Sequence, residues 1–188
     1  MRRITSDEEY NLIWDRIYAD TECSERNIRL STDGPGIVLY ADANMAHVPE
    51  GENYFSKEFQ APEKVAEHIQ KGDIIGFNTG SSGIFNITVK ADYPSENMLK
   101  EYPIAIRLAL DVKGGAVSII DLLWLTEWSS DVPDEQKVSL PDGIYHVTIM
   151  TKKPDSNIWG DNQQIFMYFN RIDEMPQLTW HGVPSLFN

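Results

Sequence analysis

Few of the side chains that perform chemistry in enzymes stand at a diagnostic spacing in this sequence. The four histidines, His47, His68, His146 and His181, form no HxH or HExxH pattern, so a metal site would need ligands from distant segments. The single cysteine, Cys23, excludes an intrachain disulfide and has no histidine or aspartate at a spacing that suggests a dyad. We therefore predict no catalytic residue, no metal ligand and no cofactor.

The segment 124–135 is different, because it carries two tryptophans into an acidic loop. Large aromatic side chains beside charged ones are typical of binding hot spots. The carboxylates would attract a partner and Trp128 would anchor it. The predicted partner-binding residues are Glu127, Trp128, Asp131, Asp134 and Glu135. The alternative is that Trp124 and Trp128 pack at the edge of the core and that the loop is ordinary solvated surface.

Two further hypotheses belong to other classes of protein. The first is a small-molecule-binding or hydrolytic domain, with His146, Asp121 and Tyr145 in a pocket between the sheet and an N-terminal helix. An enclosed pocket with converging polar groups would favour it. The second is an accessory subunit that polymerises or caps an assembly.

The net charge of the protein argues against a nucleic-acid ligand. The 16 basic and 29 acidic residues give a formal net charge of −13. Such a surface repels phosphate backbones and speeds the encounter with a basic protein. We therefore expect no nucleic-acid ligand and predict a basic protein partner. The simpler interpretation is that the charge only keeps the protein soluble.

Length and composition indicate one globular domain over residues 1–188, with 41% hydrophobic residues and no linker. The polar run 6–9 lies where a signal peptide would need an apolar segment, and the most apolar stretch, 119–125, is too short to cross a membrane. With a single cysteine, these features predict a cytoplasmic protein without a membrane span.

Helical periodicity occurs near the N-terminus. Ser6 and Glu9 form a capping box ahead of apolar residues at helical spacing, which predicts an amphipathic helix over residues 7–20. Pro62 and Gly72 mark the start and end of a second, shorter helix.

From residue 73 the hydrophobic period becomes two. Strands are expected at 36–40, 85–89, 104–112, 144–150 and 165–169, and the Gly114-Gly115 pair predicts a hairpin over residues 102–125. The fold class is therefore mainly β (α+β): an antiparallel β-sandwich with an N-terminal amphipathic helix and one short additional helix. The β-rich body covers about 73–172 and a tail follows at 173–188, which either docks across the sheet or forms a recognition segment.

The order of elements over about residues 71–172 resembles the competence protein J family of bacterial nuclease inhibitors. The similarity lies in 104–112, the Gly114-Gly115 turn, 117–121 and the sequence Leu-Pro-Asp-Gly-Ile-Tyr at 140–145. The resemblance implies an inhibitor or immunity-type protein whose acidic surface masks a basic nuclease or toxin. It identifies no interface residues.

Overall fold

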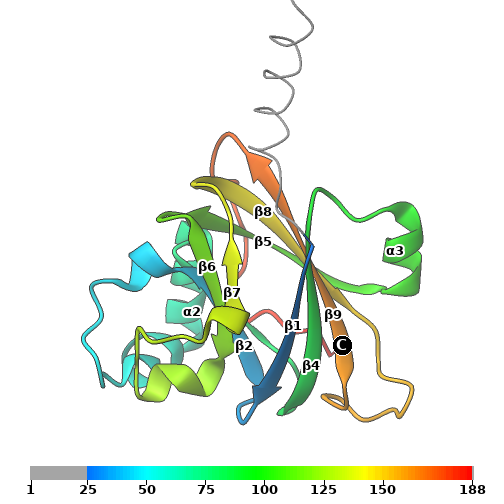
Figure 1. The fold of residues 1–188 in the computed structure, drawn as a ribbon, viewed down its shortest axis with the longest axis horizontal. Coiled ribbons are helices and arrows are strands. Elements are labelled where there is room, and N and C mark those ends of the chain that lie inside the picture. The colour runs from blue at the N-terminus through cyan, green and yellow to red at the C-terminus, as the bar shows by residue number, and fades with distance from the viewer. Residues whose placement is uncertain (1–24, 188) are drawn as a thin grey trace, which may run out of the picture.

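The computed structural model describes residues 25–187, which are mainly β-strand and form two sheets (Figure 1). The larger sheet has five strands in the order β1-β4-β9-β8-β5. Its strands are β1 (Arg26–Thr32), β4 (Gly83–Ala91), β5 (Ile104–Val112), β8 (Gly143–Thr151) and β9 (Gln163–Ile172). The β4 and β9 strands run parallel and the other neighbours are antiparallel, so this sheet is mixed.

The smaller sheet has four antiparallel strands in the order β3-β2-β6-β7. Its strands are β2 (Gly36–Ala41), β3 (Ile74–Asn78), β6 (Ala116–Asp121) and β7 (Lys137–Ser139). Residues of both sheets belong to one hydrophobic cluster, for example Phe85 and Leu108 of the larger sheet and Ile37 and Ile119 of the smaller one. Burial of both sheets in one cluster is the main source of stability that this architecture offers.

Helical segments are short and lie between the strands. The α-helices are α2 (Pro62–Lys71) and α3 (Glu96–Glu101), and the 3-10 or π turns are η1 (Asp42–Met45), η2 (Phe55–Phe59), η3 (Leu122–Thr126) and η4 (Asp134–Gln136). The helix predicted from Pro62 to Gly72 is confirmed as α2. Its buried face, with Val65 and Ile69, belongs to the core cluster.

The predicted hairpin over residues 102–125 is wrong. β5 pairs with β8 and β6 pairs with β2 and β7, so the two strands belong to different sheets. Gly114 and Gly115 both have positive φ, 83° and 75°, as expected of a tight connection. The same turn geometry can connect two strands of one hairpin or two strands of different sheets. Which strands pair depends on how the whole chain buries its apolar residues, not on the turn.

The other strand predictions, at 36–40, 85–89, 144–150 and 165–169, are confirmed within two or three residues at each end by β2, β4, β8 and β9. The class is therefore mainly β with a few helices, as predicted. The expected sheet was wholly antiparallel, whereas the parallel β4–β9 pair makes the observed one mixed. The predicted helix over residues 7–20 lies outside the described residues. None of the helices within residues 25–187 has the length and apolar character of a membrane span.

The C-terminal tail docks on β3, one of the two outcomes expected for it. The backbone of Asn78 donates to the carbonyl of Pro184 at 2.8 Å and accepts from Leu186 at 2.9 Å. Leu186 is fully buried, so the end of the tail is part of the core.

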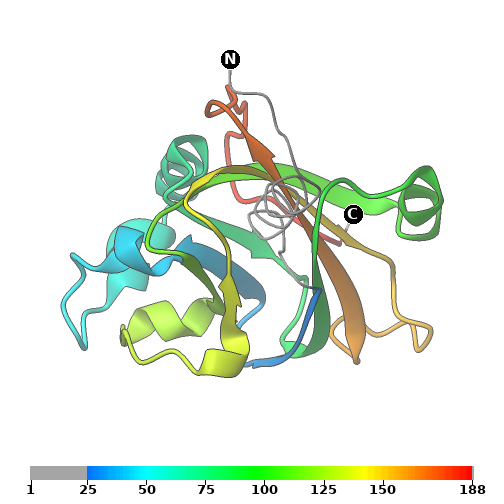
Figure 2. The ribbon, with the colours of Figure 1, turned by 45° about the horizontal axis from the view of Figure 1, so that its top comes forward.

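Two segments distant in the sequence lie side by side on one flank of the molecule (Figure 2). One runs from η1 to η2 and the other from η3 to η4. On the opposite flank lie α3 and the loop between β8 and β9 (Figures 1 and 2).

The loop before β9 offers a test of the packing. Gly160 has φ of 80°, and a Cβ there would meet the carbonyl oxygen of Ser82 and the hydroxyl of Ser81. Gly115 has φ of 75° but open space around it. We expect Gly115→Ala to lose about 1–2 kcal/mol from backbone strain alone, and Gly160→Ala to lose at least ~1 kcal/mol more. Urea denaturation measures both losses, and equal losses would show that the contact with Ser82 relaxes freely.

Candidate acidic interface and its cleft

The predicted acidic loop alternates buried and exposed side chains. Leu125, Trp128 and Val132 are buried in the core cluster. The predicted carboxylates, Glu127, Asp131, Asp134 and Glu135, are all exposed. Because the apolar anchors fix the backbone between them, the carboxylates are held at fixed positions on the surface.

The expectation that Trp128 projects as an exposed anchor is wrong. Its side chain is 3% exposed and its ring packs against Tyr40 of β2 at 5.3 Å between centroids. Trp124 is half-buried against the core, and its indole nitrogen donates to the carbonyl of Ser129 at 2.9 Å. Both tryptophans therefore hold the loop in place, which was the alternative for them. The two indole rings pack against the core because the loop has few other hydrophobic side chains that could attach it there.

A second acidic loop joins the first through its backbone. The amide of Gly51 donates to the carbonyl of Trp128 at 2.7 Å, and the amide of Trp128 donates to the carbonyl of Glu52 at 2.9 Å. The carboxylate of Glu50 accepts from the amide of Ser130 at 2.8 Å. Hydrogen bonds from Ser130 lower the pKa of Glu50, so this link between the loops is intact at neutral pH.

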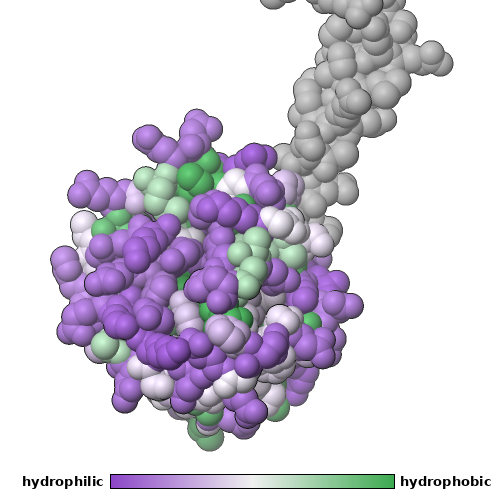
Figure 3. All heavy atoms as spheres, turned by 90° about the vertical axis from the view of Figure 1, so that its left-hand side faces the viewer, coloured by the Kyte–Doolittle hydropathy of each residue, from purple (hydrophilic) through white to green (hydrophobic). Residues whose placement is uncertain are grey.

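Nothing local in the sequence links Glu50 and Glu52 to residues 127–135. The structure brings the two groups onto one flank, which is mostly hydrophilic (Figure 3). We call this surface the acidic face, and it consists of Glu50, Glu52, Glu127, Asp131, Asp134 and Glu135.

The acidic face has few positive charges of its own. Lys57 pairs with Glu52 at 2.7 Å, and the guanidinium of Arg26 donates to the backbone carbonyl of Asp134 at 3.1 Å. Within residues 25–187, none of the four carboxylates at 127–135 forms an ion pair. Their charge is therefore uncompensated by the described part of the chain.

A cleft of about 420 Å³ adjoins the acidic face. It is lined by His47, Val48, Pro49, Glu52, Tyr54, Lys57, Glu58 and His68. Glu52 belongs to both surfaces, so the cleft opens at the edge of the acidic face. The predicted site did not include this cleft, since its walls come from a loop, η2 and α2.

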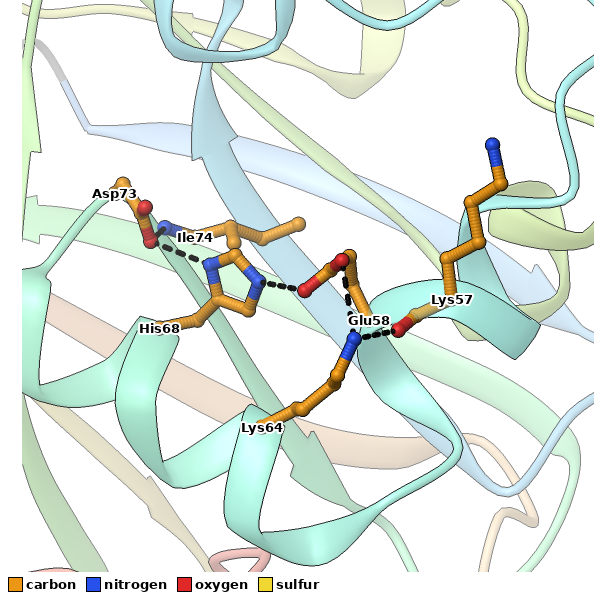
Figure 4. A network of polar contacts seen from close by, with 6 residues as sticks. All are labelled: Lys57, Glu58, Lys64, His68, Asp73 and Ile74. Carbon is orange, nitrogen blue, oxygen red and sulfur yellow. Dashed lines mark hydrogen bonds and ion pairs between the residues drawn. The ribbon is translucent and has the colours of Figure 1, made fainter.

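His68 lies in this cleft between two carboxylates (Figure 4). Its Nδ1 is 2.9 Å from Asp73 Oδ1 and its Nε2 is 3.3 Å from Glu58 Oε2. Asp73 also accepts from the amide of Ile74 at 2.8 Å, and Glu58 pairs with Lys64 at 3.2 Å. Each of the two carboxylates therefore has a second hydrogen-bond donor that fixes its position.

The two carboxylates favour the charged imidazolium. Burial lowers the pKa of His68, but the hydrogen bonds and charges of Asp73 and Glu58 exceed this effect, so the pKa is raised. For Glu58 the signs are reversed. Burial raises its pKa, but the hydrogen bonds and charges of Lys64 and His68 exceed this effect, so the pKa is lowered. Because both ring nitrogens are held by carboxylates, neither is available to take a proton from a substrate. The network is an ion-paired support for the cleft wall.

A local signal for this network was present in the sequence. His68 stands in the last turn of α2 and Asp73 follows directly after Gly72, at which the helix ends. A histidine one turn before a helix end and an acid just beyond it are neighbours in space. Glu58 gave no such signal, because it approaches from η2.

The residues of the alternative pocket hypothesis do not converge. Asp121 lies in the smaller sheet, where its carboxylate accepts from the amides of Asp33 at 2.8 Å and Leu123 at 3.2 Å. Tyr145 and His146 are consecutive residues of β8 and so point to opposite faces of the larger sheet. Tyr145 donates to the carbonyl of Pro141 at 2.9 Å. Asp121 and Tyr145 thus have separate structural roles, and His146 lies on the face of the larger sheet opposite to Tyr145.

Metal binding finds no support within residues 25–187, where no three His, Cys, Asp or Glu side chains are grouped so as to hold an ion.

Comparison with known proteins gives a likeness of fold. No protein-family model matches the sequence, and no curated protein matches it. The chain resembles the solved structure of ComJ. That protein, from Bacillus subtilis, is an inhibitor of the DNA-degrading activity of NucA, and the match has 12% identity and a TM-score of 0.43 over 78% of this chain and 96% of ComJ. The crocagin biosynthetic protein J matches with 12% identity and a TM-score of 0.46 over 77% of this chain and 94% of its own.

The resemblance to the competence protein J family is thereby confirmed as a similarity of chain arrangement. At this identity and TM-score, it assigns no site, activity or partner to the present protein.

Burial of Trp128 predicts a large effect on folding. Trp128→Ala should reduce the free energy of unfolding by about 3–5 kcal/mol, because it leaves a cavity against Tyr40. The adjacent exposed Glu127→Ala is the control and should change it by less than ~0.5 kcal/mol. Urea denaturation measures both, and a loss below ~1 kcal/mol for Trp128→Ala would contradict the core role.

The His68 network predicts a pH-dependent stability. A raised pKa in the folded state contributes stability that is full below the ordinary value of 6.5 and is lost as pH rises through the raised value. The difference in unfolding free energy between the wild type and His68→Gln should therefore be larger at about pH 5.5 than at about pH 8.5. His181→Gln, an exposed histidine in the tail, is the control. A difference that stays constant across this range would show that the ion pairs contribute nothing.

Proposed function

We propose that this protein is a non-catalytic binding module whose acidic face covers a basic surface of a protein partner. One observation carries the proposal: backbone hydrogen bonds join two loops distant in the sequence and gather their carboxylates on one flank. Four of those carboxylates are exposed and have no ion pair within the described residues. Clustered like charges repel one another, so their presence favours a role in binding over a role in stability.

The net charge of −13 supports the same interpretation at longer range. Charged surfaces raise the rate of encounter with an oppositely charged partner before any contact forms, and like charge suppresses the wrong ligands. An acidic face of this kind competes with a phosphate backbone for a basic surface instead of binding nucleic acid itself.

The rigid support of the acidic face adds to the argument. Leu125, Trp128 and Val132 are buried beneath it, and the link from Glu50 to Ser130 ties the two loops together. A surface that is fixed before binding loses little conformational entropy when a partner docks. The binding residues we propose are therefore the carboxylates of Glu127, Asp131, Asp134 and Glu135, with Trp128 acting from below as their support.

We propose a nuclease or toxin with a basic active surface as the partner, which makes this protein an inhibitor or immunity protein. Enzymes that cleave nucleic acid need Lys and Arg side chains to hold phosphates, and such a surface is complementary to the acidic face. The finer expectations remain part of this proposal: a single domain built as a two-sheet sandwich, acting in the cytoplasm without a cofactor.

The test compares two triple variants with the same change of charge. One is Asp131→Asn, Asp134→Asn and Glu135→Gln in the acidic face. The control is Glu96→Gln, Asp155→Asn and Asp161→Asn, in α3 and the β8–β9 loop on the opposite flank. The probe is a basic nuclease, preferably one encoded beside this protein's gene, and the measurements are its association rate and its residual DNA cleavage.

At ~20 mM salt the acidic-face variant should associate about tenfold more slowly than wild type, and the deficit should shrink at ~200 mM salt. The control variant should stay much closer to the wild-type rate. If both variants lose the same amount, only net charge matters and the acidic face is not the binding site. If the wild-type protein binds and inhibits no basic nuclease, the proposed function is wrong.

A further inference from the structure

An apolar groove lies where η2, η3 and the C-terminal tail meet over the smaller sheet. It has a volume of about 170 Å³ and is lined mainly by Phe55 and Phe59 of η2, Leu122 of η3, Val183 of the tail, and Gly36 and Phe77 of the smaller sheet. Asn78 also lines the groove, but its side-chain oxygen already accepts from the amide of Gly80 at 2.8 Å. A group that fills this groove is therefore apolar.

The shape of the groove is fixed by the core. Phe59, Val65 and Phe77 are buried in the core cluster. A Cβ at Gly76 would meet the ring of Phe59, and a Cβ at Gly36 would meet Leu122, so these two glycines allow η2 and η3 to lie directly on the sheet. Walls that are fixed before binding lose little conformational entropy when a ligand enters.

The mouth of the groove belongs to a larger apolar patch. Val183 lines the groove, Leu123 lies against Gly34, and Phe187 lies against Gly80. The segments 34–36 and 78–80 are themselves joined by a hydrogen bond, in which the amide of Thr79 donates to the carbonyl of Pro35 at 2.8 Å. Three of the five large apolar side chains that are exposed within residues 25–187 therefore gather here: Leu123, Val183 and Phe187. Single exposed apolar side chains are ordinary, whereas a contiguous apolar patch is typical of an interaction site.

The size of the groove limits what can occupy it. Pockets for cofactors and drug-sized ligands measure roughly 300–1,000 Å³, whereas an apolar cavity of about 150 Å³ holds a benzene ring. At about 170 Å³, the groove fits one phenyl ring.

The rim of the groove carries unpaired acidic side chains. Asp121 directly precedes Leu122, and its carboxylate accepts from the amides of Asp33 at 2.8 Å and Gly34 at 3.3 Å. Neither Asp33 nor Asp121 forms an ion pair within the described part of the chain. An apolar group that enters here is therefore favoured when its neighbours are basic.

The groove is continuous with the acidic face through η3. Leu122 begins η3 and lines the groove, and Glu127 of the acidic face follows the end of η3. Five residues of 3-10 helix span ~10 Å, at about 2 Å per residue. One partner surface can therefore cover the groove and the acidic face together.

The proposed interface needs an apolar anchor. Exposed carboxylates mainly raise the rate of encounter, whereas slow dissociation depends on a few side chains that are buried away from water. Trp128 does not supply that contact, because it is 3% exposed. The groove is a place at which an apolar side chain of the partner can be buried instead.

We propose that this groove receives one aromatic side chain of the basic partner, a phenylalanine flanked by basic residues. The phenyl ring fills the groove, and its basic neighbours face Asp33, Asp121 and Glu127. This inference rests on the proposed function, since it assigns one partner residue to a defined place beside the acidic face.

The acidic rim disfavours two other occupants. A second copy of this chain would bring a second acidic surface against the first. Residues 1–24 of the chain contain six acidic and three basic residues, so the rim repels them as well.

The experiment uses the full chain and three peptides: N-acetyl-Arg-Phe-Arg amide, N-acetyl-Arg-Ala-Arg amide and N-acetyl-Glu-Phe-Glu amide. The side-chain methyl NMR signals of Val65, Leu122 and Val183 report occupancy, because a phenyl ring shifts the signals of methyl groups packed against it. We expect Arg-Phe-Arg to shift them in a saturable manner and Arg-Ala-Arg to bind about tenfold more weakly or worse. Glu-Phe-Glu should bind several-fold more weakly at ~20 mM salt, with a smaller difference at ~200 mM.

Two matched variants locate the site. Val183→Asn changes the mouth of the groove, and Ile158→Asn makes a similar change in the β8–β9 loop on the opposite flank. The two side chains are 44% and 64% exposed, so both variants should fold, which urea denaturation checks. Val183→Asn should weaken the binding of Arg-Phe-Arg about threefold or more, and Ile158→Asn should leave it unchanged. The comparison of peptides uses the wild-type protein and tests the proposal independently of both variants.

Equal binding of Arg-Phe-Arg and Arg-Ala-Arg would overturn the aromatic anchor, and equal binding of Arg-Phe-Arg and Glu-Phe-Glu at low salt would overturn its basic neighbours. Nuclear Overhauser contacts between Val183 and residues 1–24 in the free protein would show that the chain fills its own groove. Methyl signals that change on dilution of the free protein would show that a second copy does. Either result would also overturn the proposal.

The same variants measured against the basic nuclease separate the two proposals. If the acidic-face variant associates slowly and Val183→Asn dissociates at the wild-type rate, the groove inference fails and the proposed function stands. If no basic nuclease binds while Arg-Phe-Arg occupies the groove, the proposed function fails and the groove remains a site for a phenyl ring between basic residues.

Discussion

The burial of Trp128 between two loops is the constraint on which the proposed interface depends. Its amide and carbonyl both bond to the loop that carries Glu50 and Glu52, while its ring packs on Tyr40 of β2. One residue thereby fixes the register of the two loops and attaches both to the smaller sheet. The exposed carboxylates owe their fixed positions to this buried contact, because a loop without an apolar anchor would sample many conformations.

The distribution of charge around this anchor is uneven. Carboxylates at 127–135 face solvent without an ion pair in the described chain, whereas Glu52 and Glu58 in the cleft have lysine partners. Uncompensated like charges on one flank lower stability through mutual repulsion, and a protein selected for stability alone would disperse or pair them. Their position above a well-packed anchor is the physical reason for the binding role that we propose for this flank.

The sequence predicted local structure well and pairing poorly. Period-two alternation identified β4, β8 and β9, and Pro62 with Gly72 delimited α2, because these signals depend on neighbours in the chain. The same alternation in β5 and β6 suggested a hairpin that does not exist. Which strand a segment joins depends on the total burial of both sheets, and no local pattern contains that information.

In the candidate site, too, the local features could be predicted from the sequence and the long-range contacts could not. The acidic residues 127–135 could be recognised because they are contiguous, but their link to Glu50 and the cleft beside it arise from contacts between distant segments. Trp128 was recognised as significant and assigned the wrong role, since composition does not tell a tryptophan that meets a partner from one that meets the core. The two roles are connected in the proposed interface: the buried indole fixes the backbone from which the carboxylates project, so Trp128 would contribute to binding through the positions of its neighbours.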